Sequence, residues 1–279
     1  MVMMRCEQLN LSIPGGEPFT LDCYCPEIGS YQPIGTSRAG IVLCAGGGYT
    51  HVADREMEPV ALAFAARGYN VYALHYHVAP SRYPIALTEL ALTVAYVRRN
   101  ADSLRQHPEK IALLGFSAGG HLAASLAVRW QDAALWKALC LSPEDVRPNA
   151  QVLCYPVITS GEHAHRGSFE ALTGSKESTD HAPHSLETLV TGNVPPTFLW
   201  CSWQDAAVPC ENTLLMAQAL RRVDVPAEVH IFGTGGHGVS LGTEVTWGGD
   251  PARLAPDCAL WPQLADHFLR RVFDKTEME

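Results

Sequence analysis

The pentapeptide around Ser117 has the spacing of a turn that presents a nucleophile. Residues 115–119 read Gly-Phe-Ser-Ala-Gly and match the pattern G-x-S-x-G. An apolar run over residues 111–114 precedes it, and a stretch rich in Ala and Leu over residues 122–130 follows it. This order predicts a buried strand, a tight turn that exposes the serine hydroxyl, and a buried helix. A serine in a Gly-rich helix start is the alternative interpretation, because a bare match also arises by chance.

Two other residues have the type and the position needed to activate a serine. A serine hydroxyl becomes a good nucleophile when an imidazole takes its proton and a carboxylate holds that imidazole in one tautomer. Asp205 follows an apolar run over residues 197–202, and His237 lies among glycines after a run over residues 227–232. The chain order Ser, Asp, His is the order found in α/β-hydrolases. We therefore predict Ser117, Asp205 and His237 as the catalytic residues.

Other candidate acids and bases have less suitable positions. Asp224 follows a predicted helix, and Glu211 lies in the first turn of one, where a carboxylate favours the helix dipole. His121 lies one turn after Ser117 and has no loop from which to reach the hydroxyl. We expect the remaining histidines to be solvated, because they lie in polar, loop-like sequence; they include His163, His165, His181 and His184. The sequence predicts no metal site and no cofactor.

Three consecutive glycines at residues 46–48 supply a further part of the predicted site. They follow an apolar run that begins at residue 40, and Tyr49 comes directly after them. A tetrahedral intermediate needs N–H donors at its oxyanion, and glycines allow the backbone to approach that closely. A loop that cradles phosphate is the rival interpretation. However, no Gly-Lys-Ser/Thr and no G-x-G-x-x-G follows, and Tyr49 suits the rim of a small-molecule site better.

The elements that must position these residues alternate along the chain. Predicted strands begin at residue 40 and cover residues 70–75, 111–114, 151–155, 197–202 and 227–232, after two antiparallel edge strands at residues 9–13 and 19–24. Predicted helices cover residues 57–67, 85–99, 122–130, 210–223 and 261–272. We predict one α/β domain over residues 1–279, with a doubly wound, mostly parallel sheet and an antiparallel N-terminal edge. Residues 156–194 shift to a polar composition and predict a short irregular insertion, or cap, over the sheet's edge.

Composition and charge exclude several classes of protein. The formal net charge of −9 and the absence of Lys/Arg runs argue against a nucleic-acid partner. The N-terminus lacks the apolar segment of a signal peptide, and no apolar run reaches membrane-spanning length. The nine cysteines show no repeating spacing, and Cys44, Cys154 and Cys201 lie in apolar runs. We therefore expect a reduced, cytoplasmic protein without a membrane partner. Nothing in the sequence indicates an oligomeric state.

Several stretches together resemble the α/β-hydrolase esterases of the hormone-sensitive-lipase and bacterial acetyl-esterase type. They run from about residue 40 to the C-terminus and cover most of the chain. The matching stretches are residues 45–49 with Asp54-Arg55-Glu56, residues 75–84, 115–121, 154–158 and 195–200, Asp205 with Val208-Pro209, and Gly236-His237-Gly238. The chain departs from the family at Ala45, where His or Pro is common, and at residues 201–205, where Trp203 precedes the acid.

The resemblance implies a serine esterase that removes short acyl groups, above all acetyl, from small molecules such as sugars. It implies Ser117 as nucleophile, with Asp205 and His237 as its partners. The N–H groups of three residues would form the oxyanion hole: Gly47, Gly48 and Ala118. Tyr49 and Trp203 could bind substrate by stacking on a sugar. The alternatives are a serine peptidase of the prolyl-oligopeptidase type and a non-catalytic binding protein on the same fold.

Overall fold

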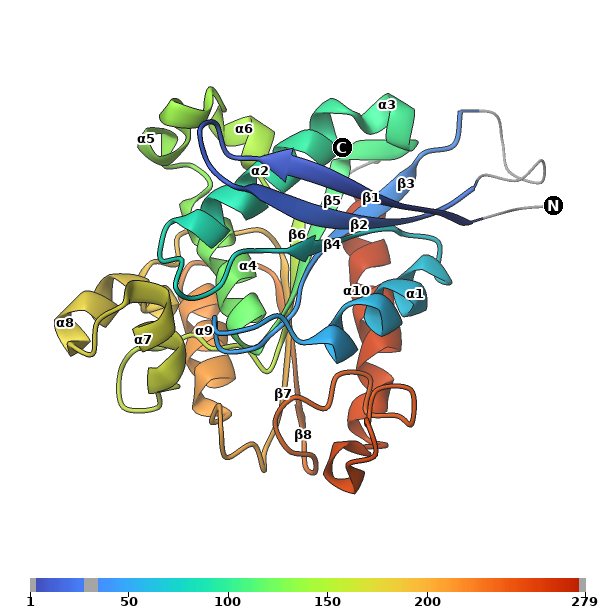
Figure 1. Cartoon of the computed structure of the whole chain (residues 1–279). Helices are drawn as coiled ribbons and strands as arrows, with labels where there is room; N and C mark the ends of the chain where they lie inside the picture. Colours follow the sequence, from blue (N-terminus) through green and yellow to red (C-terminus); the bar gives the residue numbers. More distant parts are fainter. Residues whose placement is uncertain (1–3, 28–34, 276–279) are drawn as a thin grey trace.

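A single eight-stranded sheet organises the residues that the computed structural model describes, 4–27 and 35–275 (Figure 1). The strand order is β1-β2-β4-β3-β5-β6-β7-β8. The pairs β1–β2 and β2–β4 are antiparallel, whereas every pair from β4 to β8 is parallel. The predicted mostly parallel sheet with an antiparallel N-terminal edge is confirmed. The strands are β1 (Met4–Ser12), β2 (Pro18–Pro26), β3 (Arg38–Cys44), β4 (Asn70–His75), β5 (Gln106–Phe116), β6 (Ala150–Cys154), β7 (Thr197–Ser202) and β8 (Ala227–Phe232).

Helices cover both faces of the sheet, as a doubly wound fold requires (Figure 1). The main helices are α1 (Glu58–Ala65), α2 (Ile85–Arg99), α4 (Ser117–Arg129), α9 (Glu211–Arg222) and α10 (Trp261–Lys275). Helices α2, α4 and α9 contribute to the apolar core on one face, and α1 and α10 contribute to the core on the other. Strands β6 and β7 are buried along their whole length, because both of their faces lie against helices.

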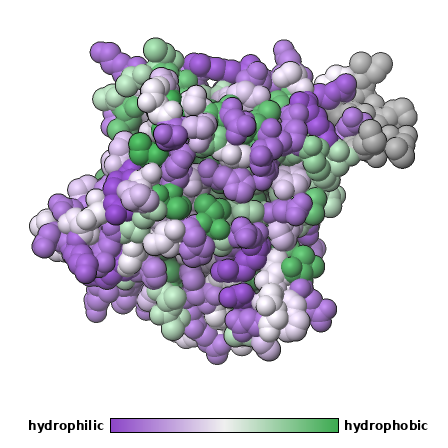
Figure 2. Space-filling view, viewed as in Figure 1, coloured by the Kyte–Doolittle hydropathy of each residue, from purple (hydrophilic) through white to green (hydrophobic). Residues whose placement is uncertain are grey.

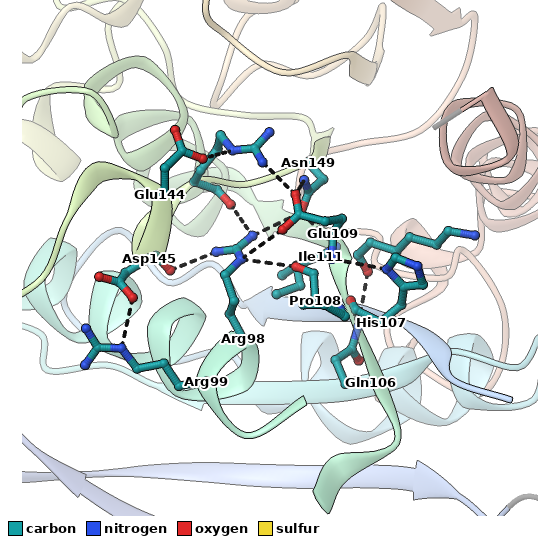
Figure 3. A network of polar contacts seen from close by, with 12 residues as sticks. Arg98, Arg99, Gln106, His107, Pro108, Glu109, Ile111, Glu144, Asp145 and Asn149 are labelled. Carbon is teal, nitrogen blue, oxygen red and sulfur yellow. Dashed lines mark hydrogen bonds and ion pairs between the residues drawn. The ribbon is translucent and has the colours of Figure 1, made fainter. Parts of the chain in front are cut away.

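Strand β5 extends beyond the apolar run that predicts it. It begins at Gln106, five residues before Ile111, where a network of polar contacts holds the chain (Figure 3). The Arg98 guanidinium of α2 donates to three backbone carbonyls, those of Pro108 (3.1 Å), Asp145 (2.8 Å) and Arg147 (2.7 Å). These bonds tie α2 and the short helix α6 (Pro143–Val146) to the beginning of β5. The network lies at the amino end of the strand, and Ser117 follows its carboxyl end.

The cap segment, residues 156–194, contains more regular structure than its composition predicts. It includes α7 (Arg166–Thr173) and α8 (Ser178–His181), with short 3₁₀ turns between α8 and β7. The segment packs against α4 and α9 through the turn at Leu186–Thr188, and Figure 1 shows α7 and α8 beside those helices. These contacts place the segment beside two helices of one face, and its position over the edge of the sheet stays a prediction. The helices of this segment have buried residues such as Phe169 and His181. The polar composition of the segment does not reveal this burial.

The surface and the helix lengths bear on contact with membranes. On the face drawn in Figure 2, hydrophilic residues surround small, separate hydrophobic spots. Within residues 4–27 and 35–275, no helix combines the length and the apolar character that a membrane crossing requires.

Cys44, Cys154 and Cys201 are buried in the strands, as their apolar surroundings predict.

Candidate active site

The turn at Ser117 joins β5 directly to α4. Ser117 has a φ of 51°, a left-handed conformation that costs energy for a residue with a side chain. Gly115 and Gly119 explain how the backbone at this turn can lie so close to neighbouring backbone atoms. A Cβ at Gly119 would lie 2.2 Å from the Cys44 carbonyl oxygen, and one at Gly115 would lie 2.3 Å from the Gly119 carbonyl oxygen. The two glycines are therefore required by close packing of backbone on backbone, and the turn holds the serine in a fixed place.

Ser117, His237 and Asp205 form a continuous chain of hydrogen bonds. The Ser117 Oγ lies 2.8 Å from His237 Nε2, and His237 Nδ1 lies 2.6 Å from Asp205 Oδ2. The other oxygen of Asp205 accepts two backbone N–H groups, those of Ala207 at 3.0 Å and Val208 at 2.9 Å. The Asp205 side chain is fully buried, whereas that of His237 is 23% exposed. The carboxylate is thus fixed in one orientation, and the imidazole lies between it and the Ser117 hydroxyl.

The glycine loop, residues 46–48, lies against the serine turn. A Cβ at Gly46 would be 3.0 Å from Ser117 Cβ, and the Gly46 N–H donates to Glu56. Gly47 has a φ of +126°, and a Cβ there would lie 2.0 Å from the His51 carbonyl oxygen, so only glycine fits. Among the described residues, the amides of Gly47 and Gly48 donate to no protein acceptor. The Ala118 N–H belongs to the first turn of α4, where no intrahelical acceptor exists.

His121 is excluded as the base by its surroundings. It is 1% exposed, and its Nε2 lies 2.9 Å from the carbonyl oxygen of His184. A carbonyl only accepts, so Nε2 carries the proton and Nδ1 accepts from the Tyr49 hydroxyl at 2.9 Å. Burial lowers the pKa of His121 to about 3. The imidazole is thus a neutral internal bridge between the residue after the glycine loop and the cap segment.

The two predicted substrate-binding residues lie in different environments. Tyr49 is 3% exposed, and its ring packs edge-to-face on Tyr76 and His121. Its observed contacts are therefore internal, and a substrate contact stays a prediction. Trp203 is 65% exposed, and its backbone N–H donates to the Phe232 carbonyl oxygen at 2.8 Å. The Trp203 ring is accessible to a ligand, and the backbone hydrogen bond to Phe232 holds residue 203 at the end of β8.

The prediction that the remaining histidines are solvated is wrong for His181 and His184, whereas His163 and His165 are partly exposed. His181 and His184 are buried, and the imidazole of His184 packs 4.5 Å from the Tyr83 ring. Burial lowers the pKa of His165, and the nearby His237 lowers it further. The Nδ1 of His165 lies 2.8 Å from Ser168 Oγ. Within the described residues, no cluster of His, Cys, Asp or Glu is arranged to hold a metal ion.

A buried apolar wall stands beside the serine, and the sequence did not single it out. The Val157 N–H donates to the Ser117 carbonyl oxygen at 3.0 Å. Val157 packs with Phe169 of α7 and Val208 of the acid loop, and all three are at most 1% exposed. In the sequence, Val157 and Val208 lie in two of the stretches that carry the family resemblance, whereas nothing marks Phe169. This wall thus links the backbone at Ser117 to the loop that carries Asp205.

The comparisons with known proteins agree with this fold. Residues 41–241 match a family model described as alpha/beta hydrolase fold. The chain belongs to this family. Its structure is similar to an acetyl ester-xyloside bifunctional hydrolase from Caldicellulosiruptor lactoaceticus, with 34% identity, a TM-score of 0.77, and 94% of this chain and 91% of the other covered. It is also similar to a carboxylesterase from Lactobacillus plantarum, with 29% identity, a TM-score of 0.85, and 96% and 98% of the two chains covered.

A curated relative is an acetylxylan esterase from Xylanibacter ruminicola. It is 26% identical over 242 residues, which are 84% of this chain and 46% of the relative. The chain thus spans less than half the length of this relative, and 34% of the length of another, an endo-1,4-beta-xylanase B from Butyrivibrio fibrisolvens.

Proposed function

We propose that this protein is a serine esterase that removes short acyl groups, above all acetyl, from hydroxylated small molecules such as sugars. The hydrogen-bonded chain from Ser117 through His237 to the buried Asp205 carries the proposal. Two similar proteins are named acetyl ester-xyloside bifunctional hydrolase and acetylxylan esterase. Their names support the proposal that the acyl group is acetyl and that the alcohol is a sugar.

The chemistry follows from the positions of these atoms. Ser117 Oγ attacks the ester carbonyl carbon while His237 Nε2 takes its proton, and Asp205 stabilises the imidazolium through Nδ1–H. The negative charge on the former carbonyl oxygen is stabilised by the N–H groups of Gly47, Gly48 and Ala118. The imidazolium then gives its proton to the leaving alkoxide, and the acyl group stays on Ser117. Water, deprotonated by His237, then attacks the acyl carbon. The bond from this carbon to Ser117 Oγ breaks, the imidazolium returns its proton to Ser117 Oγ, and the carboxylic acid leaves.

The wall of Val157, Phe169 and Val208 supports a short acyl group. These side chains are buried beside the nucleophile, so a long chain has to displace packed atoms rather than enter an open groove. The exposed ring of Trp203, two residues before the acid, supports binding of a sugar through stacking on its apolar face.

Replacing the nucleophile tests this proposal. We expect Ser117→Ala to lower kcat/KM for p-nitrophenyl acetate by roughly 10³-fold or more, because no other group can form the acyl-enzyme. Ser125→Ala is the matched control, since Ser125 is also buried on α4 and should leave the rate within a few-fold. A sulfonyl fluoride should label Ser117 in the wild type.

The same assay separates the rival functions. Acetylated xylose and a peptide p-nitroanilide are compared with p-nitrophenyl acetate. Faster turnover of the anilide would favour a peptidase, and absence of turnover of every ester, with no label on Ser117, would favour a binding protein. Either result would refute the esterase proposal.

A further inference from the structure

A buried glutamate that the proposed reaction does not use lies behind the glycine loop. Glu56 is 1% exposed and belongs to a 3₁₀ turn at Asp54–Glu56. Its Oε2 accepts the Gly46 N–H at 2.7 Å, and its Oε1 accepts the Tyr155 hydroxyl at 2.8 Å. Burying a carboxyl group is costly unless its oxygens are bonded, so these two contacts define where the glycine loop lies relative to Tyr155.

Tyr155 extends this contact to the segment that carries the proposed base. Its hydroxyl donates to Glu56 and accepts the Ser240 N–H at 3.0 Å. The Tyr155 ring packs edge-to-face on the His237 ring, with centroids 5.1 Å apart. Burial raises the pKa of Tyr155 well above its usual value, so the hydroxyl stays a donor at neutral pH. The phenol therefore supports the imidazole from one side and bonds the backbone three residues beyond it.

Arg55, the residue before Glu56, contacts the same segment, and its Nη2 also lies 3.8 Å from Glu56 Oε1. Its Nε donates to the Gly238 carbonyl oxygen at 2.9 Å, and its own carbonyl accepts the Ser240 hydroxyl at 2.7 Å. Gly238 leaves room for the guanidinium, because a Cβ there would lie 2.6 Å from Arg55 Nη2. One short turn of the chain is thus bonded on one side to the glycine loop and on the other to the histidine segment, residues 236–240.

We propose that Glu56 is a positioning residue that, together with Tyr155, holds the oxyanion donors and His237 in register with Ser117. This inference rests on the proposed esterase function. The glycine loop and the histidine segment follow different strands, β3 and β8, which are separated by three strands in the sheet. The sheet alone does not set their relative position at the precision catalysis needs, where a misplacement of about 1 Å can cost roughly 100-fold in rate.

Glu56→Gln breaks the pattern of donors while keeping the shape of the side chain. The carboxyl group accepts from two donors, whereas an amide has one oxygen and one NH₂ group. If the amide oxygen accepts from Gly46, the NH₂ group faces the Tyr155 hydroxyl, which already accepts from Ser240. The hydroxyl proton of Tyr155 then loses its acceptor, and one donor in the cluster is left unpaired whichever way the amide turns.

We expect Glu56→Gln to lower kcat for p-nitrophenyl acetate by roughly 10- to 100-fold, with KM within about threefold of the wild type. Tyr155→Phe, which keeps the ring against His237 and removes only the hydroxyl, should lower kcat in the same direction. Because both variants break one bridge, the double variant should lose less than the product of the two single losses. Glu89→Gln is the matched control: Glu89 is a fully buried glutamate, and its carboxyl accepts the His77 N–H at 2.8 Å. It should cost stability and leave kcat within about threefold.

The outcomes decide between positioning and general stability. All rates are measured at a temperature where circular dichroism shows each variant to be folded. Glu56→Gln with kcat within twofold of the wild type would overturn the inference, as would fully multiplicative losses in the double variant. If Glu56→Gln does not fold, an unchanged kcat in Tyr155→Phe overturns it. These results are distinct from failure of the proposed function, which appears as ester hydrolysis that persists in Ser117→Ala.

Discussion

The free energy of unfolding should fall in mild acid, because His121 binds a proton in the unfolded chain and stays neutral in the folded protein. The imidazole is held neutral by its two partners, and burial lowers its pKa to about 3, although the bond to the His184 carbonyl opposes part of this shift. In the unfolded chain a histidine has a pKa of about 6.5. Below that value the unfolded state binds a proton that the folded state does not bind. The contribution of neutral His121 to the free energy of unfolding is therefore fully present above pH ~6.5, and it is lost progressively as pH falls toward 3.

The magnitude follows from these two values. At pH 4.5 the unfolded chain is about 2 pH units below its histidine pKa, and the folded state is still unprotonated at His121. At ~1.4 kcal/mol per unit, the free energy of unfolding should fall by about 3 kcal/mol from this residue alone. Burial also lowers the pKa of His184, to about 4, so a second contribution of the same sign is expected.

Urea unfolding at pH 7.5 and pH 4.5 measures this effect. His121→Gln removes the titrating group, keeps a donor for the His184 carbonyl, and should reduce the difference in unfolding free energy between the two pH values by about 3 kcal/mol. His267→Gln is the control, because His267 is exposed on α10 and should leave the difference unchanged. If His121→Gln shows the same pH difference as the wild type, His121 is not buried as a neutral imidazole and the argument is refuted.

Two further predictions concern the acyl group and the serine turn. Because the wall of Val157, Phe169 and Val208 is buried, kcat/KM for p-nitrophenyl esters should fall from acetyl and propionyl to octanoyl. Values of kcat/KM that rise out to octanoyl would contradict the short-acyl proposal. Trp203→Ala should weaken binding of acetylated sugars. Gly119→Ala should lower the free energy of unfolding by about 3 kcal/mol or more, because its Cβ would meet two backbone oxygens at 2.2 and 2.3 Å. The control Gly233→Ala, with open space around its Cβ, should change stability by less than about 1 kcal/mol, and equal effects of the two changes would contradict the close crossing at Gly119.

The sequence alone determined the architecture, because local patterns carry that information. Strands β4, β7 and β8 and helix α2 have the bounds that their apolar patterns predict. The turn at Ser117 was predictable because two glycines flank the serine where the backbone must bend tightly. Asp205 and His237 were predictable because carboxyl ends of parallel strands meet at one edge of a sheet, and polar residues in those loops are therefore neighbours.

Tertiary structure decided what no local pattern records. The polar composition of residues 156–194 predicted solvated histidines, yet His181 and His184 are buried. The turn at Leu186–Thr188 packs against α4 and α9, and the Phe169 ring of α7 contacts the His181 ring. The sequence placed Tyr49 at a rim, and only the folded chain shows that its hydroxyl bonds His121, 72 positions away in the chain. Glu56 gave no signal of its burial, because its partners Gly46 and Tyr155 come from two different strand ends. Burial and hydrogen bonding of a polar side chain depend on residues distant in sequence, and only the folded chain brings them together.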